Sequence, residues 1–165
     1  MPVDADKIPE RMLGVFWASY LHTPREPGFH FPAAGSSRNL TSIYDALEHT
    51  HGGVIAPEDG PVGAVADSDA EKRVVWGVQR TRYAKPFYCG AVNGMLLCLI
   101  FRPDEDVEIR FAFSASGGGP GVPAWDYQAV VGNPKPGKVY GFKTRVVYKP
   151  FSGLEEASRL YDEWQ

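Results

Sequence analysis

The chain has 165 residues, a length that suits one domain able to bury a core without metals or disulfides. Hydrophobic residues make up 44% and charged residues 22%, and the net charge is −3 with a pI of about 5.8. This balance excludes a strongly basic surface for nucleic acid or anionic lipid, and no run approaches the roughly 18 apolar residues of a membrane helix. We therefore expect a single domain over residues 1–165, with neither nucleic acid nor membrane as a partner.

The N-terminal segment is polar and acidic and lacks the basic and apolar regions of a secretory signal, which predicts a cytoplasmic protein. Residues 12–22 alternate as a strand does, and residues 29–31 form a short extended piece. Between residues 39 and 50, four apolar residues fall at i, i+3, i+4 and i+7, which predicts a short helix.

The second half of the chain begins with a predicted strand over residues 73–83. Two apolar runs over residues 87–101 then flank Asn93-Gly94, the preferred pair for a type I′ hairpin turn. Both faces of this hairpin are apolar, so we expect it to be covered on both sides. Gly90 within it leaves room for a ligand or a bulge.

The two cysteines belong to this hairpin. A two-residue turn at Asn93-Gly94 places Cys89 directly opposite Cys98, at a separation that a disulfide could span. We expect a buried, adjacent pair that is reduced in a cytoplasmic protein and bridged in an exported one.

Three further strands are predicted over residues 107–115, 125–131 and 138–148. Residues 153–164 are predicted to form a C-terminal helix, with Ser152 and Glu155 spaced as a capping box. Consecutive strands joined by short turns indicate an all-β fold, an antiparallel sandwich of jelly-roll-like form. A small closed β-barrel is the alternative.

Three segments carry a resemblance that covers about residues 73–151: RTRYAKPFYCGAVNGM, FSASGGGPGVPAWDYQ and YGFKTRVVYKPF. They resemble a group of uncharacterised bacterial all-β proteins. The resemblance implies an all-β fold and carries no assigned activity or site residue onto this chain.

The glycine-rich stretch from Ser114 to Ala124 matches no nucleotide-binding or nucleophile motif. The spacing of its glycines differs from a dinucleotide fingerprint, Gly-Lys-Ser/Thr is missing, and a strand follows it instead of a helix. We interpret it as a connection between two strands that can border a ligand site.

Polar residues gather on one face of the predicted strands. Glu108, Arg110 and Ser114 share a face of one strand, Asp126 and Gln128 share a face of the next, and Lys143 and Arg145 share a face of the last. An ordinary solvated sheet face would look the same. Arginines beside aromatics, however, suit a carboxylated or sugar ligand. Such residues are Arg80, Arg82, Tyr83 and Tyr88.

The leading hypothesis is a β-sandwich that binds a carbohydrate or another small polar or acidic ligand, or a lyase or hydrolase acting on one. For catalysis, Arg110 or Arg82 would neutralise a carboxylate, Asp126 or His51 would be the base, and Tyr88 or Tyr83 the acid. A hydrolase would pair Asp126 with Glu108. The candidate ligand-binding residues are Trp125, Gln128, Arg80, Arg82, Tyr83 and Tyr20.

Two other classes of function remain open. The chain could be a non-catalytic binding module, or an oligomerisation module that uses its aromatics as an interface between copies. A metal-dependent enzyme would use His49 and His51, which form an H-x-H pair, with His22 and His30 completing the cluster. Surface histidines explain the same pattern, so no cofactor is expected.

Overall fold

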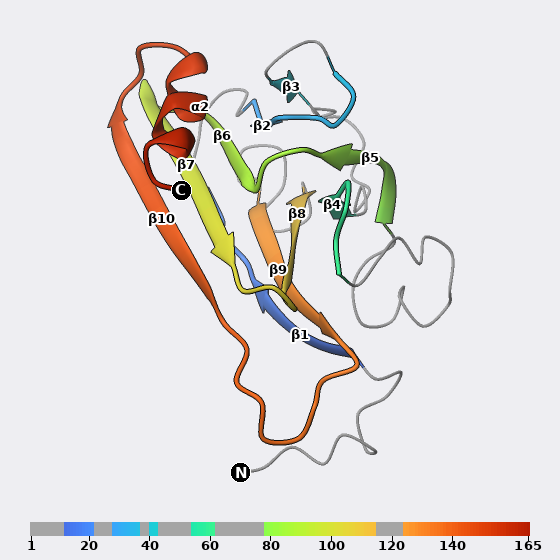
Figure 1. Ribbon diagram of the computed structural model, residues 1–165. Helices are drawn as coiled ribbons and strands as arrows, with labels where there is room; N and C mark the ends of the chain where they lie inside the picture. Colours follow the sequence, from blue (N-terminus) through green and yellow to red (C-terminus); the bar gives the residue numbers. More distant parts are fainter. Residues whose placement is uncertain (1–11, 22–27, 37–39, 43–53, 62–77, 115–123) are drawn as a thin grey trace.

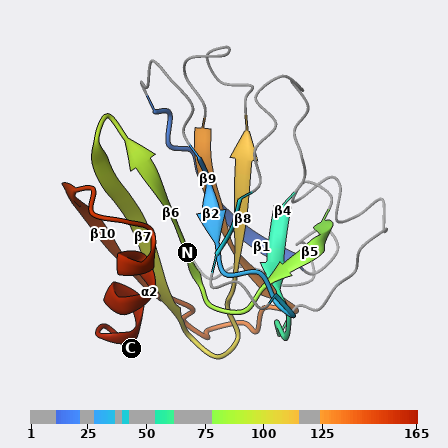
Figure 2. The same ribbon diagram turned by 90° about the horizontal axis from the view of Figure 1, so that it is seen from above.

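The computed structural model describes residues 12–21, 28–36, 40–42, 54–61, 78–114 and 124–165 (Figure 1). Their strands form two five-stranded sheets that face each other as two layers (Figure 2). The prediction of an all-β sandwich is therefore confirmed, and the described strands do not close into the alternative barrel.

One layer, here called the β8 sheet, is antiparallel except for the parallel pair of β4 with β5. In spatial order its strands are β1 (Met12–Trp17), β9 (Ala124–Gly132), β8 (Glu108–Ser114), β4 (Val54–Pro57) and β5 (Val78–Tyr83).

The other layer, here called the β6 sheet, carries the helix α2 (Glu155–Asp162) on its outer side (Figure 1). In spatial order its strands are β10 (Phe142–Pro150), β7 (Met95–Pro103), β6 (Phe87–Val92), β2 (His30–Phe31) and β3 (Thr41–Ser42).

The prediction of a helix over residues 39–50 is wrong at its start. Thr41–Ser42 is the strand β3, which pairs antiparallel with β2 at His30 and Phe31. Strand pairing here outweighs the helical spacing of the apolar residues, because that spacing alone is a weak signal in a short segment rich in Thr and His. Residues 43–53 lie outside the described part of the chain.

The hairpin of β6 and β7 forms as predicted. Asn93 and Gly94 both have positive φ, at 53° and 75°, which is the type I′ conformation. Cys89 lies directly opposite Cys98, and both are buried thiols. The hydrogen bond that the Cys98 thiol makes to Cys89 and the burial of the pair raise the pKa of Cys98.

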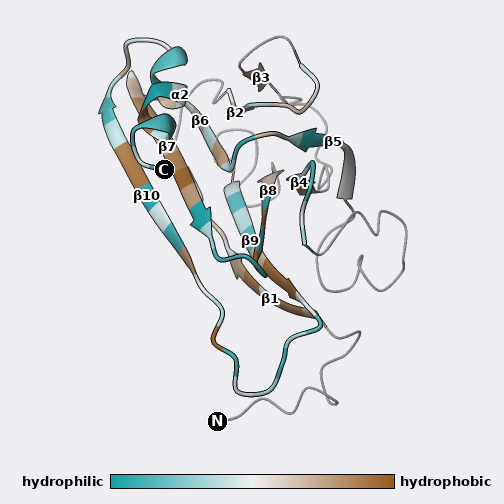
Figure 3. Cartoon of the chain, in the orientation of Figure 1, coloured by the Kyte–Doolittle hydropathy of each residue, from teal (hydrophilic) through white to brown (hydrophobic). Residues whose placement is uncertain are grey.

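Both faces of this hairpin are covered, as its apolar sequence predicts. One face packs against the β8 sheet in an aromatic core that includes Tyr88, Phe101 and Trp125. The opposite face packs against α2, whose Ala157 and Leu160 are buried on it. Figure 3 shows β7 in hydrophobic colour along most of its length. Among the described residues, no helix is both long enough and apolar enough to cross a membrane.

Gly90 has no free space at the position of a side chain. A Cβ atom there would lie 1.9 Å from the carbonyl oxygen of Gly28 and 2.6 Å from the indole of Trp125. The room that this glycine leaves is therefore filled by the protein's own backbone and by the largest buried side chain of the core.

The helix α2 is tied to β10 through Glu156. Its carboxylate accepts hydrogen bonds from Lys149 Nζ at 2.6 Å and from Ser152 Oγ at 2.5 Å. The predicted capping box of Ser152 with Glu155 does not form, because the helix begins at Glu155, two residues later than predicted, and Ser152 bonds Glu156 instead. These contacts lower the pKa of Glu156, through the Lys149 bond first, to about 2.

We predict that Gly90→Ala destabilises the protein by about 3 kcal/mol, because neither the Gly28 carbonyl nor the indole of Trp125 can move without shifting a layer. Urea unfolding measures the change. Gly141→Ala is the control, since its added Cβ would lie 3.2 Å from a flexible Asp104 oxygen and should cost less than about 1 kcal/mol. Equal stability of the two variants would contradict the packing described here.

We predict that Glu156 makes the fold sensitive to acid. Because its pKa falls from the ordinary 4.5 to about 2, its stabilising effect is complete above pH 4.5 and is lost as the pH falls through 2. Glu156→Gln should therefore flatten the dependence of the unfolding free energy on pH between 4.5 and 2. Glu155→Gln, on the same helical turn, serves as the control and should leave that slope unchanged.

Candidate functional site

The polar residues predicted on β8 and β9 do share one face of the β8 sheet. Arg110 lies opposite Gln128, and Ala112 lies opposite Asp126. The aromatic neighbours Trp125 and Tyr127 point to the other side, into the core, as the alternation predicts.

This polar face is not open to solvent. The exposed fractions are 1% for Glu108, 0% for Arg110, 2% for Asp126 and 4% for Gln128, and the candidate ligand-binding residue Trp125 is buried as well. Simple alternation predicts which face a side chain takes but not whether other segments cover that face. The glycine-rich stretch over residues 115–123 lies outside the described residues.

Glu108 and Arg110 form a buried ion pair. Arg110 Nε donates to Glu108 Oε1 at 2.6 Å, between side chains that are 0% and 1% exposed. Gly60 lies directly over the carboxylate, and a Cβ at that position would be 2.2 Å from Glu108 Oε2. The pair therefore holds a carboxylate just beneath the turn that follows β4.

Asp126 anchors a neighbouring segment, and Gln128 lies beside it on the same face. Asp126 Oδ1 accepts a hydrogen bond from the backbone N–H of Ser19 at 3.1 Å, and this holds the chain that follows β1. Gln128 lies between Phe16 and Arg110 in register, and its Oε1 accepts no hydrogen bond from the described residues. Tyr20, a predicted ligand-binding residue, bridges to Ala124 and is 56% exposed.

The two tyrosines predicted as acids are both buried. Tyr88 donates to the carbonyl oxygen of Trp125 at 3.4 Å, and Tyr83 donates to that of Ile109 at 2.6 Å. Burial raises the pKa of both hydroxyls well above the ordinary value of 10, with the carboxylates of Asp126 and Glu108 adding to it. Both groups therefore hold their protons at neutral pH.

The basic residues are distributed differently from the prediction. Lys143 and Arg145 lie on β10, which pairs with β7 in the other sheet, so they do not extend the polar face. Arg82 is half-buried on β5 beside Ala56, and Arg80 lies on the same strand.

Of the four histidines, the structure describes His30. It is half-buried on β2, and burial lowers its pKa. His22, His49 and His51 fall outside the described residues, and within those residues no group of His, Cys, Asp or Glu is placed to hold a metal ion.

The proposed hydrolase pair is widely separated along the sheet. Asp126 is opposite Ala112, four residues from Glu108, which corresponds to about 13 Å along the strand. Glycosidase carboxyl groups lie about 5–9.5 Å apart. This spacing, together with their burial, gives a hydrolytic role for Glu108 and Asp126 little geometric support.

A pocket of about 350 Å³ opens at one end of the sandwich, and we refer to it as the acidic pocket. Three turns build it: the turn that follows β4, the β5–β6 connection and the β7–β8 connection. The last two cross between the layers. Hydrogen bonds from Glu58 N to the Tyr83 carbonyl, from Phe101 N to the Pro86 carbonyl and from Val107 N to the Asp104 carbonyl fix the three turns in that order.

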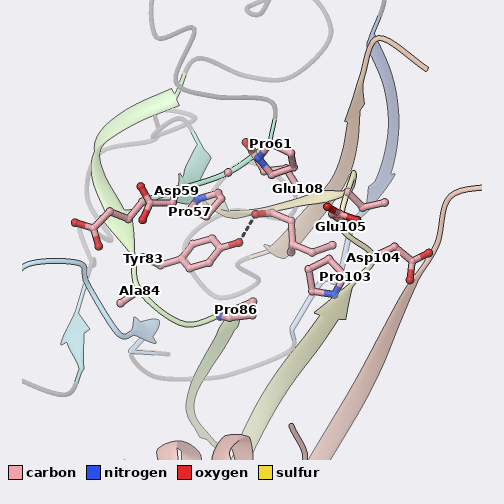
Figure 4. A pocket seen from close by; sticks show the side chains of 14 residues that line it. Pro57, Asp59, Pro61, Tyr83, Ala84, Pro86, Pro103, Asp104, Glu105 and Glu108 are labelled. Carbon is pink, nitrogen blue, oxygen red and sulfur yellow. Dashed lines mark hydrogen bonds between the residues drawn. The ribbon is translucent and has the colours of Figure 1, made fainter. Parts of the chain in front are cut away.

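The walls of the acidic pocket combine acidic and apolar groups. Figure 4 shows Pro57 and Asp59 on one side, Pro103 and Glu105 on the other, and the Tyr83 ring between them. Its carboxylates are Glu58, Asp59, Asp104, Glu105 and Glu108, and its prolines are Pro57, Pro61, Pro86 and Pro103. Glu108 is buried at its base, while the other four acids are exposed, and no described lining residue is Lys, Arg or His.

Sequence reasoning found Tyr83 and Glu108 of this pocket and missed the rest. A signal was present, because Pro57-Glu58-Asp59 and Pro103-Asp104-Glu105 are both a proline followed by two acids in a turn. Each triplet alone reads as a solvated turn, and only the fold brings the two together.

Comparison with known proteins gives no match to this chain among family models, curated proteins or solved structures. Its functional assignment therefore depends on the site itself.

We predict that breaking the buried ion pair costs about 3 kcal/mol of unfolding free energy. Glu108→Gln leaves the Arg110 guanidinium buried without its carboxylate, and removal of one partner typically costs about 3–5 kcal/mol. Denaturant unfolding measures the loss. The double change Glu108→Leu with Arg110→Met should be less destabilising than Glu108→Gln, and the opposite order would contradict a tightly coupled pair.

Proposed function

We propose that this domain binds a neutral or positively charged carbohydrate in the acidic pocket. The observation that carries the proposal is the composition of that pocket: five carboxylates and four prolines line about 350 Å³, with no basic group among its described lining residues. Ligand pockets in proteins range from about 300 to 1,000 Å³, so the cavity is large enough for a small sugar.

The carboxylates determine which ligands the pocket favours. An ionised carboxylate accepts hydrogen bonds and donates none, so it suits the hydroxyl donors of a sugar or the ammonium group of an amino sugar. The four exposed acids, Glu58, Asp59, Asp104 and Glu105, would repel an acidic sugar. This argues against the acidic ligand expected from the arginines, since Arg110 is already paired with Glu108.

The apolar parts of the wall support the same ligand class. Proline rings present rigid C–H surfaces that cost no side-chain entropy on binding, and the Tyr83 ring is held in place by stacking on Phe111 at 4.4 Å between ring centres. A sugar ring offers both polar edges and apolar faces to such a wall. These polar and apolar groups are sufficient for binding. Catalysis would also need an acid and a base positioned at the bond that reacts, and the geometry supports this less.

A glycan array followed by calorimetry tests the proposal. We expect glucose-type and glucosamine-type ligands to bind more tightly than the matched glucuronate, with the amino sugar losing affinity as salt is added. The double variant Asp59→Asn and Glu105→Gln should weaken binding by at least tenfold, because it removes acceptors from both sides of the pocket.

Glu155→Gln provides the matched control, as it removes an exposed carboxylate at the start of α2 that does not line the pocket, and it should leave binding unchanged. Preference for glucuronate, or failure of every neutral and amino glycan on the array to bind, would overturn the proposal.

A further inference from the structure

The edge strand β1 carries an exposed apolar surface. Leu13, Val15 and Trp17 continue the inner face of the β8 sheet, opposite the core residues Val131, Ala129 and Tyr127, yet they are 39%, 55% and 57% exposed. Phe16, on the other face, is 49% exposed. Figure 3 shows this edge in hydrophobic colour.

Within its described residues, β1 also has none of the charges or prolines that protect sheet edges. No residue from Met12 to Trp17 is charged or proline. The edge strand β10 of the other layer carries Lys143, Arg145, Lys149 and Pro150, and β5, at the opposite edge of the same sheet, carries Arg80 and Arg82. Charged and proline edges prevent strand addition, whereas a neutral, apolar edge favours it.

The Trp17 side chain of β1 is held in place by its neighbours. The Trp17 ring stacks on Tyr127 with an interplanar angle of 13°, and its Nε1 donates to Ser19 Oγ at 2.9 Å. Ser19 is in turn held by Asp126, which accepts its backbone N–H. An exposed tryptophan held by Tyr127 and Ser19 loses little entropy when a partner covers it.

We propose that β1 is the contact between two copies of this chain, which pair antiparallel about a twofold axis at Val15. In that register Val15 meets Val15 and Leu13 meets Trp17 of the second copy, which joins the two inner faces into one apolar surface. On the other face Phe16 lies over Gly14 of the second copy, a pairing in which the aromatic ring covers the bare backbone. Like-charge repulsion does not arise, because the strand has no charge.

The exposed area is sufficient for a dimer. Large aromatic side chains carry about 150–250 Å² each, so the half-exposed side chains of Leu13, Val15, Phe16, Trp17 and Tyr20 offer on the order of 500 Å² per copy. Two copies would bury at most about 1,000 Å² of these side chains, the lower range for a specific interface, and the paired backbone adds to it.

Sedimentation equilibrium of the full chain tests the proposal. We expect the wild type to be dimeric at micromolar concentration and Val15→Lys to be monomeric with an unchanged circular dichroism spectrum. Thr81→Lys, an exposed β-branched position on the opposite edge strand of the same sheet, is the matched control and should remain dimeric.

Cysteine cross-linking tests the register. Val15→Cys should form an intermolecular disulfide on mild oxidation, since residues directly opposite in antiparallel strands lie about 4.5–5.5 Å apart at Cα. A monomeric wild type, a dimer that survives Val15→Lys, or a dimer whose Val15→Cys variant does not cross-link would each overturn the proposal. Failure of sugar binding would leave it standing, because no residue of β1 lines the acidic pocket.

Discussion

The packing of Trp125 against Gly90 sets the distance between the two layers, and much of the structure depends on it. The indole is fully buried and meets Phe29 and Tyr88 in edge-on contacts at 5.5 and 6.1 Å between ring centres. A side chain at position 90 would overlap both this ring and the Gly28 carbonyl. The Trp125 side chain therefore has to point into the core, and this determines which face of the sheet each other residue of β9 occupies.

Because Trp125 and Tyr127 point inward, Asp126 and Gln128 must point to the opposite face, beside Arg110 of β8. That face is buried, so its charges need partners, and the ion pair of Glu108 with Arg110 supplies one. The same pair holds the Glu108 carboxylate at the base of the acidic pocket. The pocket is thus coupled to the core through β8. Ile109 and Phe111 pack in the core on one face of this strand, while the Glu108 carboxylate lies at the base of the pocket on the other face.

Features that depend on neighbouring residues could be predicted from the sequence, whereas features that depend on distant segments could not. The β6–β7 hairpin, its turn at Asn93-Gly94 and the pairing of Cys89 with Cys98 depend on adjacent residues, and the sequence was enough to predict them. The helix α2 was predicted for the same reason. Thr41–Ser42 became a strand because β2 supplies a partner from outside the local pattern.

The site was harder to predict than the fold, because burial and convergence both depend on distant segments. Alternation placed Arg110 and Asp126 on the correct face but could not show that the face is covered. Asp59 and Glu105 lie 46 positions apart in the chain and belong to different turns, so neither turn alone indicates a pocket. The carboxylates of the assembled pocket favour a neutral or positively charged ligand, whereas the scattered arginines suggested an acidic one.

The two proposed surfaces lie on one sheet without sharing a residue, and this arrangement has a consequence for binding. β8, β4 and β5, which border the acidic pocket, lie two, three and four strands from β1, about 10 to 19 Å away. A dimer formed through β1 would therefore leave both pockets open and hold them at a fixed separation. A single pocket with exposed carboxylates gives modest affinity, since solvent screens its charges. Two pockets on one rigid dimer would bind a repeating chain with an effective concentration set by the sheet itself, and the gain would be largest for a polymer whose repeat matches their spacing.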